Sequence, residues 1–246
     1  MSAESEEIGA YFQCYKQPTA TYHALLNFRR SYPTGSVVLL SDAGYDYSRM
    51  AAHFGATYVH SKDNIGVAAG PGKPLGPNLS QFRRYIARLV PAIEMIDAAH
   101  FMWLEDDVRV IRRYSVPFAG TLNGNVVYKI AAATFDAIPF CLSPRVDSYY
   151  TGHGGTVYEK ASFLAMLRNA TVNDWLIDNW SKLRRGKFID NDLFFSLSCY
   201  VQGMRVERLA EHSDGAVRAN TAVLHRDKQF YNVKPDDTIR ALFDGS

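Results

Sequence analysis

Cysteine is scarce in this 246-residue chain, which has three: Cys14, Cys141 and Cys199. They are widely spaced without a CxxC pair, which argues against a zinc cluster, and their odd number does not suggest a disulfide framework. No run reaches the ~18 consecutive apolar residues of a membrane span. The acidic, polar start of the chain is unlike a secretory signal. We therefore expect a reducing, cytoplasmic setting.

Neither sign of charge dominates, since 27 Lys and Arg face 25 Asp and Glu for a net charge of +2. The basic residues are dispersed among acids, so nucleic acid is not expected as a partner. Aromatic residues are abundant, with 15 Tyr and 14 Phe; most are expected to fill a core, although such rings also stack on sugars and bases. The length fits one large α/β domain or two small ones.

The first sixty residues alternate between strand and helix patterns. Strands are expected over residues 8–15, 37–40 and 57–59, and helices over residues 19–30 and 46–54. Thr19 or Thr21 is expected to cap the first helix. This alternation predicts a parallel sheet with right-handed crossovers, in which ligands bind at the carboxyl ends of the strands. Asp42 stands at such an end, where it is either a ligand-binding carboxylate or an ordinary turn residue.

The most informative stretch runs from residue 100 to residue 110 and reads HFMWLEDDVRV. Its apolar part predicts a buried strand. The carboxylates that follow at once, Glu105, Asp106 and Asp107, are costly at such a place unless a cation offsets their desolvation. Hard divalent cations take carboxylate oxygens, and Mg²⁺ commonly combines them with substrate phosphates. The hypothesis is a metal–diphosphate site; the alternative is an acidic turn facing water.

A Gly- and Pro-rich loop spans residues 62–79 ahead of this stretch. Its GPGK sequence is not a P-loop, because five residues separate Gly66 from Gly72 where the motif needs four, and Pro74 replaces the required Ser or Thr. Ser80 is then expected to cap a helix, which Pro91 should kink or restart. The apolar stripe of that helix comprises Phe82, Ile86, Leu89, Ile93 and Ile96.

Three arginines of the same helix, Arg83, Arg84 and Arg88, lie off the apolar stripe and are expected to be solvated. Arg83 or Arg84 is close enough to the long loop to reach a phosphate.

In the second half, strands are expected over residues 126–133, 204–209 and 222–226, and helices over residues 159–167 and 175–187, with a third opening near Asp190. Residues 135–150 read as irregular, residues 213–220 as a flexible loop, and residues 228–246 as partly loose. Gly152, Gly154 and Gly155 allow a backbone to approach a ligand closely, or form a tight bend. Asp190 and Asp192 suit the start of a helix whatever else they do.

In this order the motifs resemble the GT-A fold of nucleotide-sugar glycosyltransferases over about residues 8–226. The EDD stretch is similar to the DxD metal motif, the segment 64–66 to an N-x-G after the third strand, and the segment 189–193 to the E-D-x-D-L of many inverting members. Ile189 departs from that last pattern by replacing its first acid. Small soluble enzymes of large algal DNA viruses are a nearer comparison within this resemblance.

The resemblance implies an α/β fold with a mixed, mainly parallel sheet flanked by helices. It implies one domain over residues 1–246, with a nucleotide-binding half (about 8–110), an acceptor and catalytic half (about 111–230) and a tail (231–246). The implied activity is metal-dependent transfer of a sugar, with inversion, from a nucleoside-diphosphate sugar, UDP-sugars foremost, to a hydroxyl of a glycan or glycoconjugate. Because the sequence shows no membrane anchor, the expectation includes a chain that is one domain of a longer protein.

The same resemblance implies roles for individual residues. Asp107, with Glu105 and a late ligand at His225, would hold Mn²⁺ or Mg²⁺, and Asp190, with Asp192 as second choice, would be the general base. The implied donor contacts are Tyr15, Lys16, Gln17, Asp42, Asn64, Arg83, Arg84, Glu105, Asp106, Gly154, Gly155, Arg226 and Lys228.

Two other functions fit the same signals. A sugar-1-phosphate nucleotidyltransferase has a related core, but it should carry a Gly-rich basic loop after the first strand, and residues 14–18 contain no glycine. A non-catalytic module that binds nucleotide sugars without turnover is the second alternative, because fold does not fix function.

Overall fold

The computed structural model describes residues 7–65, 79–141, 148–184 and 190–245. Its strands are β1 Gly9–Cys14, β2 Val37–Asp42, β3 Thr57–Ser61, β4 His100–Leu104, β5 Arg109–Val110, β6 Leu122–Gly124, β7 Val126–Lys129, β8 Tyr149–Thr151, β9 Val157–Glu159, β10 Val206–Arg208, β11 His212–Asp214 and β12 Val223–His225. Its helices are α1 Pro18–Ser31, α2 Ser48–His53, α3 Leu79–Glu94, α4 Ala132–Asp136, α5 Lys160–Arg168, α6 Ala170–Arg184, α7 Asn191–Val201 and α8 Asp237–Arg240.

The central sheet has seven strands in the order β10-β6-β9-β4-β1-β2-β3. The neighbours β4-β1, β1-β2, β2-β3 and β10-β6 are parallel, and β9 runs antiparallel to both β4 and β6. The fold is therefore the predicted α/β class, a mixed and mainly parallel sheet flanked by helices. Because β4 lies beside β1 within this sheet, the EDD segment follows a strand end next to the middle of the sheet.

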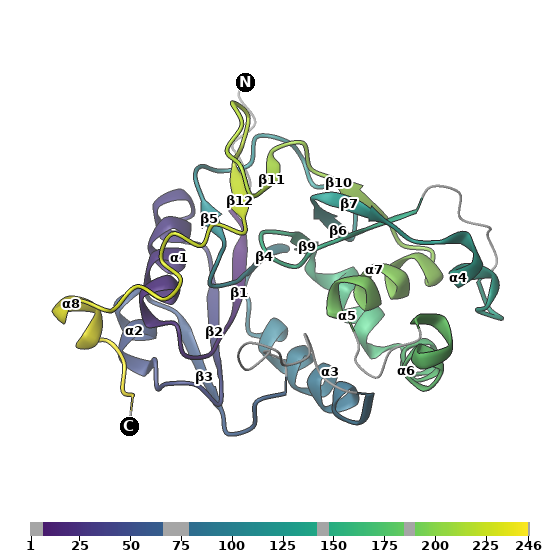
Figure 1. Cartoon of the computed structure of the whole chain (residues 1–246), viewed down its shortest axis with the longest axis horizontal. Coiled ribbons are helices and arrows are strands. Elements are labelled where there is room, and N and C mark those ends of the chain that lie inside the picture. Colours follow the sequence, from purple (N-terminus) through teal and green to yellow (C-terminus); the bar gives the residue numbers. More distant parts are fainter. Residues whose placement is uncertain (1–6, 66–78, 142–147, 185–189, 246) are drawn as a thin grey trace.

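The two faces of the sheet carry separate apolar clusters, as side-chain alternation along the strands requires. On one face, Tyr11, Phe101 and Trp103 pack with α3, α5, α6 and α7. On the other, Phe12 and Leu104 pack with α1 and α2. Figure 1 shows the two groups of helices on opposite sides of the sheet. The whole apolar stripe expected on α3 is buried.

A smaller sheet, in the order β11-β12-β5, brings a late segment of the chain beside β5, the strand that follows β4. β12 pairs antiparallel with β5, so that Val223 faces Val110 and Leu224 faces Arg109. A parallel pairing with β12 places β11 on its other side. The expectation of a flexible loop over residues 213–220 was therefore wrong at its start, because Ser213 and Asp214 belong to a strand.

Two expected helix boundaries were also wrong. Helix α1 begins at Pro18, a favoured first position, and Thr19 and Thr21 lie inside it rather than capping it. Their hydroxyls donate instead to Val233 O and to Asp106. Helix α3 continues past Pro91 to its last residue at position 94 and does not restart there.

The segment 228–246 was expected to be partly loose, but its described residues pack against the rest of the chain. Phe230 stacks on His23 of α1 with ring centroids 3.6 Å apart, and Phe243 stacks on Tyr45 at 5.2 Å. The side chain of Asp236 caps α8. Aromatic contacts of this kind offset the entropy of ordering a polar segment.

Irregular structure was expected over residues 135–150, but α4 extends into this segment to residue 136 and β8 begins at residue 149. The features predicted around Gly66, Gly72, Pro74 and Ile189 lie outside the described residues. Among the residues that the structure describes, no helix has both the length and the apolar character needed to cross a membrane.

Candidate active site

Three side chains from two distant parts of the chain meet at the carboxyl end of β4. Glu105 and Asp107 lie in the turn between β4 and β5, and the pairing of β5 with β12 brings His225 beside that turn. A backbone bond from Asp227 N to Asp107 O, at 2.9 Å, ties the two segments together. One ligand atom from each of Glu105, Asp107 and His225 lies within 4.8 Å of the others.

The imidazole of His225 has a defined orientation. Its Nδ1 lies 2.9 Å from Asp214 Oδ1, and its Nε2 lies 3.3 Å from Glu105 Oε2 and 3.6 Å from Asp107 Oδ1. Burial lowers the pKa of His225, but Asp214, Glu105 and Asp107 together raise it to about 10. The three carboxylates thus favour a positive charge at this position.

The chemistry of this donor set fits a divalent cation. Two carboxylates and one imidazole are common ligands of such ions. Asp214 holds Nδ1 of His225 and so directs Nε2 toward the carboxylates, an outer contact typical of metal-bound histidines. Asp107 and Glu105 are both partly exposed, which leaves room for a substrate oxygen beside them. Glu105, Asp107 and His225 are therefore the residues able to hold a metal.

A second group of close side chains is less suited to bind a divalent cation. It comprises His212, Asp214 and His225. His212 Nδ1 accepts a hydrogen bond from the Asn125 backbone N–H at 2.9 Å. Burial and the neighbouring His225 lower the pKa of His212 to about 3, so the ring is neutral. Its single proton is then on Nε2, which leaves no lone pair for a cation there. We assign His212 a structural role.

Asp190 and Asp192 differ in what their carboxylates contact. Asp190 caps α7 by accepting from Leu193 N at 3.2 Å, as the capping interpretation predicted. Asp192 instead accepts from the backbone N–H of His153 at 3.0 Å. Burial and the negative charges of Glu105 and Asp190 raise the pKa of Asp192 well above its ordinary value. A raised pKa is typical of a carboxylate that serves as a base near neutral pH.

The glycines of the segment 152–155 form a wall of backbone beside Asp192 and beside the metal group, which comprises Glu105, Asp107 and His225. A Cβ on Gly152 would lie 3.5 Å from Asp192 Oδ2 and 3.6 Å from His225 Cε1, so Asp192 and His225 lie against the same glycine. A Cβ on Gly154 would lie 2.5 Å from His225 Cδ2 and 2.8 Å from Glu105 Oε2. The wall can approach the metal group this closely only because position 154 has no side chain.

Gly155 has a different role from Gly154. Its φ of +83° lies in the left-handed region, and its N–H donates to Trp103 O at 2.8 Å. It makes the bend that leads the segment into β9, and a Cβ on it would meet Val223 and His212 rather than the metal group. The tight bend, one of the two alternatives left open for the glycines, is thus present at Gly155, and the close approach of their backbone to a ligand stays a prediction.

The middle carboxylate of the EDD segment points elsewhere. Asp106 accepts a hydrogen bond from Thr21 Oγ1 on α1 at 2.9 Å. Burial raises the pKa of Asp106 to about 7, with smaller contributions from Asp107 and Glu105. The Asp106 side chain thus faces α1 at the end of β4. Its negative charge also contributes to raising the pKa of Tyr231.

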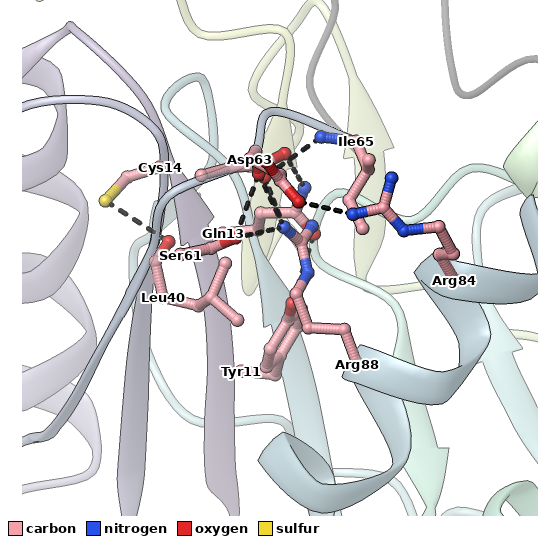
Figure 2. A network of polar contacts seen from close by, with 10 residues as sticks. Tyr11, Gln13, Cys14, Leu40, Ser61, Asp63, Ile65, Arg84 and Arg88 are labelled. Atoms are coloured by element: carbon pink, nitrogen blue, oxygen red, sulfur yellow. Dashed lines mark hydrogen bonds and ion pairs between the residues drawn. The ribbon is translucent and has the colours of Figure 1, made fainter. Parts of the chain in front are cut away.

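Asp42 is enclosed in a polar network at the ends of β2 and β3. Figure 2 shows Gln13, Ser61 and Arg88 of this network. Asp42 has no exposed surface, and its carboxylate accepts from Gln13 Nε2 at 2.9 Å, from Ile65 N at 3.2 Å and from the Arg88 guanidinium. Arg88 also contacts Ser61 Oγ at 3.0 Å. The expectation that Arg88 is solvated was wrong. The burial of Asp42 does not support its implied contact with a base or ribose.

The two other arginines of α3 are held away from the metal group. Arg83 contacts Asp174 and Asp178 on α6, at 2.6 and 2.9 Å, and Arg84 contacts Asp63 after β3. All of these side chains are exposed, as predicted for the arginines, and neither arginine is brought near the metal group by these contacts.

Comparison with solved structures gives consistent neighbours. Galactosyltransferase LgtC in complex with donor and acceptor sugar analogs matches with a TM-score of 0.51 and 12% identity, over 95% of this chain and 99% of that one. An active-site mutant of LgtC matches with a TM-score of 0.53 at the same identity and coverage. Mouse xyloside xylosyltransferase 1 matches with a TM-score of 0.51 and 8% identity, over 93% and 99%.

The chain has the GT-A glycosyltransferase fold. At these identities the likeness establishes the fold alone. No protein-family model matches the sequence, and no curated protein matches it. These neighbours confirm the predicted GT-A fold, and the DxD motif and the comparison with viral enzymes stay predictions.

The remaining residues assigned to the donor lie around the same end of the GT-A sheet. Lys228 Nζ is 3.3 Å from Asp107 Oδ2, and Arg226 Nε is 3.7 Å from Asp214 Oδ2. Lys16 Nζ lies over the ring of Tyr15 at 5.2 Å. Gln17, by contrast, contacts Asn232 through both its amide atoms and so ties α1 to the C-terminal segment.

Asn64, which was also assigned to the donor, has a buried amide nitrogen without a hydrogen-bond partner among the described residues. Sequence reasoning missed Asp214 and His153. Residues 212–214 are His, Ser and Asp, a polar run without the alternation of apolar and polar residues that would predict a strand.

Proposed function

We propose that this chain is a metal-dependent glycosyltransferase that moves a sugar from a nucleoside-diphosphate sugar, UDP-sugars foremost, to a hydroxyl of a glycan or glycoconjugate. The observation that carries the proposal is the convergence of Glu105, Asp107 and His225 at the end of β4 within a GT-A fold. In this account residues of about 8–110 bind the nucleotide, and those of about 111–230 bind the acceptor.

Glu105, Asp107 and His225 would hold Mn²⁺ or Mg²⁺, with Mn²⁺ preferred because Mg²⁺ favours an all-oxygen shell and imidazole binds later divalent ions more readily. When bound, the cation acts as a Lewis acid that neutralises charge on the leaving diphosphate. Asp214 supports this role by orienting His225. The half-buried positions of the two carboxylates restrict water around them.

Lys228 and Arg226 would bind the phosphate oxygens of the donor. Lys228 is largely exposed, with its Nζ 3.3 Å from Asp107 Oδ2, so an anion that contacts Asp107 through the cation also comes within reach of this ammonium group. Positive groups positioned in advance stabilise a leaving diphosphate without reorganisation during the reaction.

Asp192 is the base that we propose, ahead of Asp190. Asp190 caps α7, whereas the Asp192 side chain retains 36% exposure beside the metal group and has a raised pKa. The Asp192 carboxylate would accept the proton of the acceptor hydroxyl as that oxygen bonds to the sugar. Asp192→Asn should keep donor binding and lose transfer, whereas Asp190→Asn should mainly destabilise α7.

The test is release of the free nucleotide from a panel of sugar donors, with Mn²⁺ and with EDTA. UDP-, GDP- and dTDP-sugars would release the nucleoside diphosphate, and CMP-sugars would release CMP. Turnover of the donors of one nucleotide, and only with Mn²⁺, supports the proposal and identifies the nucleotide base of the donor. Binding without turnover would favour the non-catalytic alternative, and release of pyrophosphate from a nucleoside triphosphate and a sugar-1-phosphate would favour a nucleotidyltransferase.

The anomeric configuration of the product, read by NMR, tests the role of Asp192. Inversion is expected where Asp192 acts as a base on the acceptor. Retention would show that this carboxylate faces the donor sugar instead.

A further inference from the structure

We propose that His153 is the positioning residue for the Asp192 carboxylate, holding its Oδ1 so that Oδ2 is presented to the substrate. This inference rests on the proposed function. His153 lies between β8 and β9, 39 positions before Asp192 on α7. Nothing in its sequence context marks it, because it is one histidine among glycines.

Two donors of His153 converge on one oxygen. The backbone N–H donates to Asp192 Oδ1 at 3.0 Å, and the imidazole Nε2 lies 3.4 Å from the same oxygen. Nε2 is buried and forms no aligned hydrogen bond among the described residues, so the 3.4 Å contact is a close approach rather than a formed bond. Catalytic hydrogen bonds are often long in the absence of substrate and tighten in the reacting complex.

The ring of His153 has little freedom to move. It is 4% exposed and stacks on Trp103, with centroids 4.4 Å apart and planes 17° from parallel. Phe195 of α7 packs against it at 5.1 Å. Trp103 lies on β4, two residues before Glu105 in the turn that follows this strand. The histidine therefore links the position of Asp192 to the strand that carries the metal group.

The contact with Tyr158 is consistent with the Nε2-protonated tautomer of His153. The phenol oxygen lies 2.5 Å from His153 Nδ1. Burial raises the pKa of Tyr158 well above its ordinary value, so the phenol keeps its proton. Burial also lowers the pKa of His153 to about 4, so the ring carries a single proton. When the phenol donates to Nδ1, that proton is on Nε2, where it faces the Asp192 carboxylate.

The arrangement leaves the other oxygen of Asp192 available. No hydrogen bond to Asp192 Oδ2 is formed within the described residues, and this atom lies beside Gly152, the glycine that His225 also approaches. A base needs one oxygen fixed and the other free to accept a proton. His153 supplies the fixed contact, and its neutral ring does not compete for that proton at neutral pH.

The first arm of the test does not depend on turnover. In long-range ¹H–¹⁵N spectra of histidine-labelled protein, the signal that disappears in His153→Phe identifies His153. We expect the Nε2-protonated tautomer and a shift of that signal in Asp192→Asn and in Tyr158→Phe. An Nδ1-protonated ring, or a signal that does not respond to Asp192→Asn, would overturn the proposal.

The second arm separates positioning from packing. His153→Phe keeps a ring on Trp103 but has no donor, so kcat for the donor that the wild type turns over should fall at least about tenfold, within the range of a general-base contribution. The KM of the donor should change less than about twofold. His153→Gln places an amide nitrogen near the Nε2 position and should recover part of kcat, whereas His153→Asn, which reaches only the Nδ1 position, should not.

Three kinetic results have distinct meanings. Unchanged kcat in His153→Phe overturns the proposal. Loss of the thermal stabilisation by UDP and Mn²⁺ in the same variant also overturns it, because His153 would then support the whole site. A wild type that turns over no donor contradicts the proposed function, and the spectra then decide the contact between His153 and Asp192 independently.

Discussion

Asp214 Oδ1 lies 2.9 Å from His225 Nδ1, on the other edge of the ring from Glu105 and Asp107. A carboxylate at this place both fixes the imidazole and raises its basicity. The account therefore treats Asp214 as part of the metal centre although it need not touch the ion.

Asp214→Ala should weaken Mn²⁺ binding about tenfold to a hundredfold, as loss of such an outer contact typically does. Isothermal titration with Mn²⁺ measures the effect. Glu207→Ala is the control, because Glu207 lies on the edge strand β10 of the central sheet and pairs with Arg205 rather than with the metal group. Equal affinity of the Asp214 variant and the wild type would remove Asp214 from the centre.

Two glycines of one segment give a matched pair. Gly154→Ala would put a Cβ 2.5 Å from His225 Cδ2, so the metal group must shift, whereas Gly152→Ala makes only ordinary contacts at 3.5 Å and beyond. We expect at least about a tenfold loss of Mn²⁺ affinity in Gly154→Ala, by analogy with other disturbances of metal ligands, and a small change in Gly152→Ala. Equal effects of the two substitutions would contradict the closer approach of Gly154 to the metal group.

Arg88→Met should destabilise the fold by about 3–5 kcal/mol, because it leaves the buried carboxylate of Asp42 without its counter-charge. Urea unfolding measures the change. The control is Arg84→Met on the same helix, where an exposed pair with Asp63 is lost and a change of about 0–1 kcal/mol is expected. The double variant Arg88→Met with Asp42→Asn should recover part of the loss. Similar values for the two single variants would show that the Asp42 pair does not stabilise the fold.

Glu159 gives a pH-dependent contribution to stability. It caps α5 by accepting from Ser162 N at 2.7 Å and Ala161 N at 3.2 Å. Burial raises the pKa of Glu159, but these hydrogen bonds lower it by a larger amount. The pKa in the folded state is therefore depressed. The stabilisation is then complete above the ordinary Glu pKa of about 4.3 and is lost as pH falls through the depressed value.

Glu159→Ala should therefore lower the free energy of unfolding by about 0.5–2 kcal/mol at neutral pH, and by less in acid. Chemical denaturation at several pH values checks this trend. A destabilisation that stays constant into acid would show that the charge of Glu159 has no part in the cap.

The sequence predicted the features that local pattern controls. The three strands of the first sixty residues and the buried stripe of α3 follow from apolar periodicity, and the placement of Glu105 and Asp107 follows from an apolar run that ends in carboxylates. His225 was assigned from the resemblance alone, because pairing between β5 and β12, more than a hundred residues apart, has no local signature.

The sequence could not predict contacts that tertiary packing decides. Arg88 was expected to be solvated because it lies off the apolar stripe, yet the end of β2 offers it a buried partner. The choice between Asp190 and Asp192 depended on which carboxylate the helix cap occupies. His153 reaches Asp192 only through the bend of the glycine segment, which sequence spacing does not reveal.

The most direct test of the central claim is electron spin echo spectroscopy of Mn²⁺ bound to the protein, with and without UDP. The account predicts ¹⁴N modulation from one imidazole, ³¹P coupling when UDP is added, and loss of both in Asp107→Ala while the variant stays folded. Persistence of the same ¹⁴N and ³¹P signals in Asp107→Ala, or no nitrogen signal in the wild type, would show that Glu105, Asp107 and His225 are not the metal centre.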